Sequence, residues 1–121
     1  MSESPPYQRH PYTDAMPGKD IHKKERLAEL FEHIIHLSCS LESPFRLSPE
    51  ELADQFIGTK STISRHIGDL KKAGFIETCK IKNKNHVSVT NKGHTLWMDK
   101  EIEMHSYTEY REKLYKRNFI S

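Results

Sequence analysis

The sequence predicts a single, mainly α-helical domain that carries one small β-hairpin and ends in a long helix. Its 121 residues are enough for one domain with a modest core. Apolar residues recur every three or four positions between Leu27 and Leu41, which is the spacing of one helix face. After Gly74 the pattern alternates as in a strand, and helical spacing returns from about Lys92 to Arg117. A helical domain with one hairpin accounts for all three patterns.

Composition narrows the class of protein. Charged residues make up 30% of the chain and hydrophobic residues 35%, so the core must come from a few well-patterned segments. No run approaches the roughly 18 apolar residues of a membrane span, and the N-terminus lacks the apolar stretch of a secretory signal. We therefore expect a cytoplasmic protein with no membrane association. Cys39 and Cys79 lie far apart, which indicates reduced thiols rather than a disulfide framework or a zinc knuckle.

Residues 1–19 predict a flexible, proline-rich tail. The segment holds four prolines and one glycine without an apolar period. Its aromatic and basic side chains offer contacts to a partner, but a floppy tail is the simpler interpretation. Those side chains belong to Tyr7, Arg9, His10 and Tyr12.

Local signals mark the starts and ends of three helices within residues 20–93. Asp20 is the expected N-cap of the first helix, and residues 42–44 end it because Pro44 removes a donor. Ser48 caps a short second helix that begins at Pro49 and carries an acid at its third position to close a capping box. Leu52, Ala53 and Phe56 would face inward on this helix, and Gly58 would end it.

The third helix has one apolar and one polar face. Thr59 is its expected N-cap, and the helix should run to about Ala73, with Gly74 as its stop. Ile63, Ile67 and Leu70 share the inward face of the helical wheel, whereas the opposite face holds Ser61, Arg65, Gly68 and Lys72.

Residues 75–82 and 86–90 predict a hairpin around an asparagine-containing turn, and the last helix follows it. We expect residues 94–121 to form a dimerisation helix, because the predicted core leaves no surface to cover its apolar side chains. The eight side chains of that predicted core are Leu30, Ile34, Leu52, Ile63, Ile67, Leu70, Ile76 and Val89. The exposed set would be Met104, Tyr107, Tyr110, Leu114, Tyr115 and Phe119. The alternative is that this helix folds back on residues 20–41 within one chain.

Positive charge is concentrated in one segment. Residues 58–94 carry eight Lys or Arg side chains against two acids, Asp69 and Glu77, whereas the net charge of the whole chain is only +2. A charge run of this kind is often a solvated surface. Its position on a capped helix followed by a hairpin favours a binding face for a polyanion.

Residues 47–77, which read LSPEELADQFIGTKSTISRHIGDLKKAGFIE, resemble the helix-turn-helix of the MarR-type, PadR-type and catabolite-activator-type bacterial regulators. Residues 89–93, Val-Thr-Asn-Lys-Gly, are similar to the segment that closes the wing in the first two groups. The resemblance implies a winged helix-turn-helix that binds double-stranded DNA. It further implies a homodimeric bacterial, plasmid or phage transcriptional repressor. A centromere- or origin-binding adaptor in plasmid partition, replication or transfer is the alternative.

The DNA-binding residues expected on this basis lie on the third helix and the hairpin. Small polar and basic side chains suit base edges in the major groove, and Arg65 is the best candidate for a bidentate contact to guanine. Lysines on the helix end and the hairpin suit phosphates. The full predicted set is Thr59, Lys60, Ser61, Thr62, Ser64, Arg65, Lys71, Lys72, Lys80, Lys82, Lys84 and Asn85.

Metal and enzyme hypotheses receive less support. His33, His36 and Cys39 recur every three residues, with Glu32 adjacent, but a metal would need further ligands, so surface or interface side chains are the preferred interpretation. We expect Cys79 to be buried or half-buried. Because the sequence contains no phosphate loop, nucleophile elbow or carboxylate pair, it predicts no catalytic residue, no metal site and no cofactor.

Overall fold

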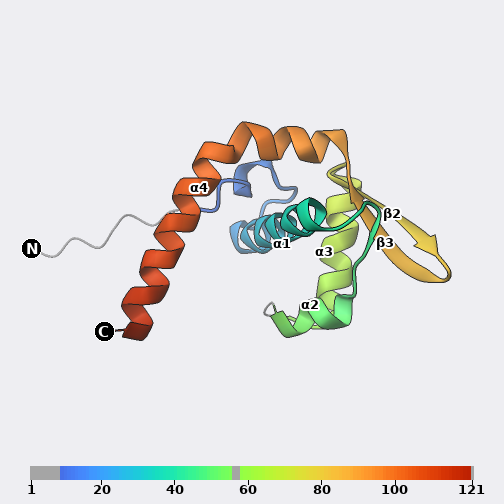
Figure 1. The fold of residues 1–121 in the computed structure, drawn as a ribbon, viewed down its shortest axis with the longest axis horizontal. Coiled ribbons are helices and arrows are strands. Elements are labelled where there is room, and N and C mark those ends of the chain that lie inside the picture. The colour runs from blue at the N-terminus through green and yellow to red at the C-terminus, as the bar shows by residue number, and fades with distance from the viewer. Residues whose placement is uncertain (1–8, 56–57, 121) are drawn as a thin grey trace, which may run out of the picture.

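The computed structural model describes the backbone of residues 9–55 and 58–120, with side chains for residues 9–54 and 58–116. The chain is mostly helical, with a small antiparallel sheet and a long C-terminal helix (Figure 1). This agrees with the predicted fold class at that level of detail. In chain order the elements are η1 (Thr13–Ala15), α1 (Ile21–Ser40), β1 (Phe45–Arg46), α2 (Pro49–Gln55), α3 (Lys60–Lys72), β2 (Ile76–Ile81), β3 (Lys84–Val89) and α4 (Asn91–Ile120).

Side-chain caps begin the helices where the sequence predicts them. Asp20 accepts a hydrogen bond from the His22 N–H at the start of α1, and Thr59 accepts one from the Thr62 N–H at the start of α3. At α2 the Glu51 N–H donates to the Ser48 hydroxyl oxygen, so the cap is confirmed. The carboxylate that contacts Ser48 is that of Glu50, whereas the expected partner is Glu51 at the third position of the helix.

The hairpin is confirmed, with a two-residue turn at residues 82–83 in place of the expected turn at residues 83–85. β2 and β3 pair antiparallel from Ile76 opposite Val89 to Ile81 opposite Lys84. Lys82 and Asn83 form the two-residue turn, and both have positive φ, 51° and 65°, which is the geometry of a tight hairpin turn. The sheet order is β1-β3-β2, so β1 adds a third strand to the predicted hairpin.

The core lies between α1, α3 and the sheet. Six of the eight expected core side chains are buried, and the other two, Ile67 and Val89, are half-buried. Phe56, which was expected to face inward on α2, lies outside the described residues. The six buried members of the expected set are Leu30, Ile34, Leu52, Ile63, Leu70 and Ile76.

Residues 10–16 correct the expectation of a flexible tail, because they pack into the core. The Tyr12 side chain is 0% exposed, and its ring meets Phe31 edge-on with the ring centroids 5.2 Å apart. His10 is also buried and lies between Tyr12 and Tyr107, at centroid distances of 5.3 and 4.9 Å. Large aromatic rings of this kind stabilise the core by burying area, which outweighs the turn-forming tendency of the nearby prolines. Residues 1–8 lie outside the described part.

The packed N-terminal segment also covers part of α4. Met104 and Tyr107 are 7% and 8% exposed, so the expectation that both would lie bare in a monomer is wrong. Tyr110 and Leu114 are half-buried and Tyr115 is exposed, while the side chain of Phe119 lies outside the described part. The last turns of α4 lie on the opposite side of the molecule from the β2–β3 hairpin (Figure 1).

A compact junction joins the hairpin to α3 and α4. The Thr90 hydroxyl donates to the Gly74 carbonyl and accepts from the Gly93 N–H, so it caps α4 while holding the end of α3. Lys92 Nζ donates to the Ala73 carbonyl oxygen at 2.7 Å and lies over the Phe75 ring. These contacts fix the hairpin relative to α3.

No helix in the described part of the chain is long and apolar enough to cross a membrane.

Candidate nucleic-acid interface

Helix α3 presents a polar, cationic face to solvent. Ser61, Arg65 and Lys72 are exposed, as the helical wheel predicts, whereas Gly68 of the same predicted face is half-buried. Ser64 is exposed as well. The apolar residues of α3 turn inward, because burying Ile63 and Leu70 against α1 fixes the rotation of the helix. The outer face therefore combines hydroxyl donors and acceptors with two positive charges.

The single acid of α3 is turned away from this face. The Asp69 carboxylate lies 3.2 Å from Lys23 Nζ of α1, and this ion pair neutralises it on the side of the helix that contacts α1. His66 also faces inward, and burial lowers the pKa of its imidazole. Asp69 lies one helical turn after Arg65, so it is the pairing with Lys23 that offsets its charge at the edge of the exposed face.

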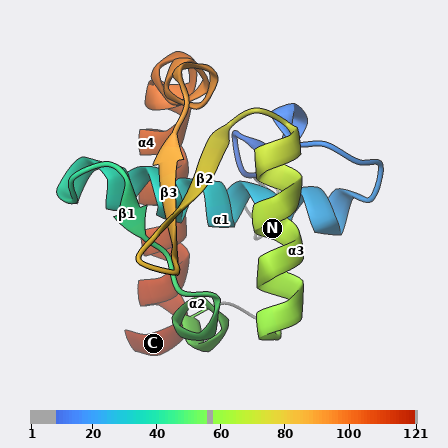
Figure 2. The ribbon, with the colours of Figure 1, turned by 90° about the vertical axis from the view of Figure 1, so that its right-hand side faces the viewer.

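The hairpin stands beside α3, with α1 crossing behind both (Figure 2). Residues paired across the strands share one face of the sheet, so Lys80 and Asn85 lie on the same face as Thr78 and Val87. Lys84 belongs to the other face. The three expected lysines of the hairpin, Lys80, Lys82 and Lys84, are therefore divided between its two faces and its turn.

The second face of the hairpin contains groups that are not among the predicted site residues. Arg46 of β1 is exposed and pairs with His86 of β3, which is the cross-strand partner of Cys79. Cys79 is itself exposed, which corrects the expectation of a buried or half-buried thiol. A two-residue strand has too short a pattern to be detected in a sequence, so Arg46 carried no signal that linked it to the hairpin.

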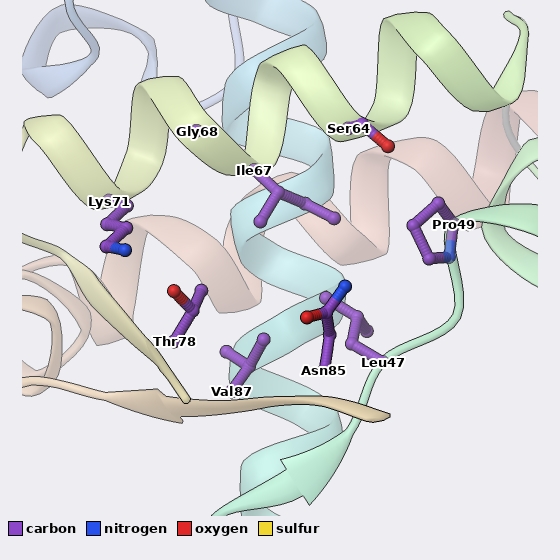
Figure 3. A pocket seen from close by; sticks show the side chains of 9 residues that line it. All are labelled: Leu47, Pro49, Ser64, Ile67, Gly68, Lys71, Thr78, Asn85 and Val87. Carbon is purple, nitrogen blue, oxygen red and sulfur yellow. The ribbon is translucent and has the colours of Figure 1, made fainter. Parts of the chain in front are cut away.

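A cleft of about 270 Å³ separates α3 from the hairpin (Figure 3). Ser64 and Lys71 line it from α3, and Thr78 and Asn85 line it from the strands. Ile67 points into it from the helix and Val87 from the sheet, as Figure 3 shows. Four polar side chains from three elements, α3, β2 and β3, thus meet around one partly apolar cleft.

Lys60, one of the expected DNA contacts, is engaged by α2. Its Nζ lies 2.7 Å from the Glu50 carboxylate, in an exposed ion pair that connects the starts of α2 and α3. The hydrogen bond from Lys60, together with those from the Glu50 backbone and the Ser48 hydroxyl, lowers the pKa of Glu50 to about 2. Glu50 therefore stays ionised and competes with any other anion for Lys60.

The histidine-rich face of α1 shows no metal geometry. Within the described ranges, no group of three or more His, Cys, Asp or Glu side chains is placed to hold a metal ion. Glu32 instead lies 2.7 Å from His10 and 3.5 Å from Arg111. Burial and the nearby His36 lower the pKa of His33, and Cys39 is exposed.

The chain matches no protein-family model, no curated protein and no solved structure. The site itself offers an acid-free helix face beside a lysine-bearing hairpin, with Arg65 and Lys84 among the exposed cations.

Proposed function

We propose that this protein is a winged helix-turn-helix that binds double-stranded DNA with sequence preference, most simply as a homodimeric transcriptional repressor. The observation that carries the proposal is the acid-free outer face of α3 next to the cationic hairpin. A helix fits the major groove of DNA, which is about 12 Å wide, and α3 has 13 residues, or about 20 Å of length.

The arrangement around α3 supports insertion into a groove. α2 and α3 are joined at Gly58, whose φ of 146° lies in the region that favours glycine. The Thr90 and Lys92 contacts hold the hairpin against the other end of α3. The hairpin would then serve as the wing, lying beside the DNA backbone when α3 enters the groove.

Different residues would take different roles at the DNA. Arg65 is the base-reading residue, because its guanidinium can bond O6 and N7 of guanine together, and Ser61 lies on the same face. Lysines at the end of α3 and on the hairpin contact phosphates. These contacts contribute affinity and fix the position of the protein on the duplex, but they do not select its base sequence. Arg46 adds a phosphate contact from β1.

A second copy of the chain would pair through the solvent side of α4. Met98 and Ile102 are 66% and 84% exposed and lie one helical turn apart, so they form a small apolar strip. Two-fold pairing of this strip would cover it in both subunits. Pairing would also allow two α3 helices to lie about one duplex turn apart, roughly 34 Å.

Selection from a pool of random duplexes tests the proposal. Repeated binding to the intact chain should enrich one sequence motif, and a two-fold symmetric motif is expected from a dimer. The affinity for that motif should fall with salt, with a slope of about −0.9 for each phosphate neutralised. A pool that remains random after selection, or an affinity that does not depend on salt, would contradict the proposal.

A further inference from the structure

Two cations of α1 lie beside α3, on the side of α3 away from the hairpin. Figure 2 shows α1 crossing behind α3, with its N-terminal end emerging on one side and the hairpin standing on the other. At this end Lys23 Nζ lies 3.2 Å from the Asp69 carboxylate of α3, and Arg26 follows one helical turn later and is exposed. Both cations lie outside the basic segment of residues 58–94, so neither is among the predicted site residues.

The electrostatics of His66 show that these cations and the proposed base-reading residue share one neighbourhood. Burial lowers the pKa of the His66 imidazole, and three positive charges lower it further, against the effect of Asp69. The three charges are those of Lys23, Arg26 and Arg65. The cationic surface of α3 therefore continues onto α1.

The acids of the same turns of α1 have other partners. Glu25 accepts a hydrogen bond from the Thr13 hydroxyl at 3.1 Å, and residues two positions apart on a helix do not face the same side, so it points away from the side of Lys23. Asp20 accepts the capping hydrogen bond from the His22 N–H. The acid that a DNA backbone would meet on this side of α3 is Asp69, and Lys23 neutralises it.

We propose that the first turns of α1 bind a second DNA backbone, with Arg26 contacting a phosphate directly and Lys23 acting as a positioning residue that neutralises Asp69. A helix in the major groove has a phosphate backbone on each side, and the hairpin would lie beside only one of them. The end of α1 lies on the side where the other backbone would pass. This inference rests on the DNA binding proposed above and extends the contact surface to a third element.

Arg26→Gln tests the direct contact. The variant should bind the selected duplex and a scrambled duplex roughly fivefold more weakly, with a salt slope smaller by about one, because a phosphate contact is the same on every sequence. Arg9→Gln removes the same charge from the N-terminal segment, where the side chain is 51% exposed, and should change neither quantity. Equal effects of the two variants would overturn the contact.

Replacement of single phosphates locates the contact on the DNA. Uncharged methylphosphonates are introduced one at a time into both strands of the selected duplex. The wild-type chain should lose affinity at phosphates on both sides of the groove. Arg26→Gln should become insensitive to replacement on one side, and Lys84→Ala to replacement on the other. If both variants become insensitive at the same phosphates, or if only one side is sensitive in the wild type, the placement of α1 is wrong.

The role of Lys23 is tested through Asp69. The two side chains are 41% and 24% exposed, so breaking the pair leaves the core intact. Lys23→Met should weaken binding of both duplexes because it leaves the carboxylate uncompensated, whereas Lys23→Arg keeps the charge and should bind nearly as the wild type does. Adding Asp69→Asn to Lys23→Met should restore the affinity of Asp69→Asn alone. A double variant that binds as weakly as Lys23→Met would assign Lys23 to a phosphate and overturn its positioning role.

These measurements separate failure of this inference from failure of the proposed function. A wild-type chain that binds no duplex would refute both. A wild-type chain that binds the duplex, with Arg26→Gln and Lys23→Met binding equally well, would refute the contact from α1 and leave the proposed function standing.

Discussion

The buried imidazole of His10 donates a hydrogen bond from Nε2 to the carboxylate of Glu32, over 2.7 Å. The direction follows from the other ring nitrogen, because Nδ1 accepts from the Tyr12 N–H and so carries no proton. Arg111 of α4 approaches the same carboxylate at 3.5 Å. One carboxylate on α1 thus connects the N-terminal segment to the C-terminal helix.

Glu32→Gln should destabilise the protein in a pH-dependent manner. Burial raises the pKa of Glu32, but the hydrogen bond from His10 and the nearby Arg111 outweigh burial and hold it below the ordinary 4.5. A lowered folded-state pKa contributes stability that is complete above about pH 4.5 and is lost as the pH falls through the folded-state value. At pH 7 we expect the free energy of unfolding to drop by about 1–3 kcal/mol.

Urea unfolding at several pH values measures this difference. Glu42→Gln, at an exposed position, is the matched control and should leave the free energy of unfolding nearly unchanged. A loss for Glu32→Gln that is the same at pH 7 and at acidic pH would show that the carboxylate charge is not what stabilises the contact.

Gly93→Ala should destabilise the junction between the hairpin and α4. A Cβ at this position would collide with the Phe75 carbonyl oxygen and lie 2.7 Å from the Val89 side chain, so the backbone would have to move. The expected cost is about 1–3 kcal/mol of unfolding free energy. Gly68→Ala is the matched control, because its Cβ would meet open space within α3 and should stabilise by about 0.5–1 kcal/mol. Similar effects of both substitutions in urea unfolding would contradict the close packing at Gly93.

Glu50→Gln should strengthen DNA binding. It removes the charge that holds Lys60 in the 2.7 Å ion pair, so the lysine becomes available for a phosphate. We expect a few-fold higher affinity for cognate and scrambled duplexes alike, with a steeper salt dependence. Glu42→Gln removes a charge elsewhere and should have a smaller effect, and equal gains for both variants would mean that only net charge matters.

Ile102→Glu should shift the protein from dimer to monomer. The Ile102 side chain is 84% exposed, so the change leaves the core intact. A truncation of α4 at His105 would be a less specific test of the interface, because it would also remove the buried Tyr107. Sedimentation at micromolar concentration should give about twice 14.2 kDa for the intact chain and about half that mass for the variant. Leu41→Glu replaces another exposed apolar residue and should remain dimeric. A monomeric wild-type chain would remove α4 from the proposed interface.

Local patterns predicted most of the framework, because each depends on a few neighbouring residues. Asp20 and Thr59 cap helices through bonds to N–H groups two and three residues away. The positive φ angles at Gly58 and Gly74 follow from the freedom of glycine at helix ends. The polar face of α3 follows from helical spacing alone.

Contacts between distant segments carried no such signal. The His10–Glu32 hydrogen bond spans 22 residues, and nothing near His10 indicates that its segment packs in the core. Likewise, the position of Lys60 on α3 predicted a cation available to bind DNA. Its ion-pair partner Glu50 belongs to a different helix, α2, so the pattern of α3 gave no sign of the pair. The predicted site therefore did not include the ion pair that restrains one of its cations.

The proposed base-reading role of Arg65 and phosphate role of Lys84 should separate by sequence dependence. Arg65→Ala should cost about 1–3 kcal/mol on the cognate duplex and little on a scrambled one. Lys84→Ala should weaken both duplexes alike and reduce the salt slope by about one. Arg65→Ala reducing the affinity of both duplexes equally would assign it to a phosphate instead.

Whether the outer face of α3 and the hairpin bind DNA together is tested most directly by amide NMR of the full chain with its selected duplex. We predict that the largest shifts map to residues 59–72 and 80–85, with the later turns of α4 unaffected. Shifts confined to α4, or no shifts at concentrations at which the duplex is bound, would contradict the account.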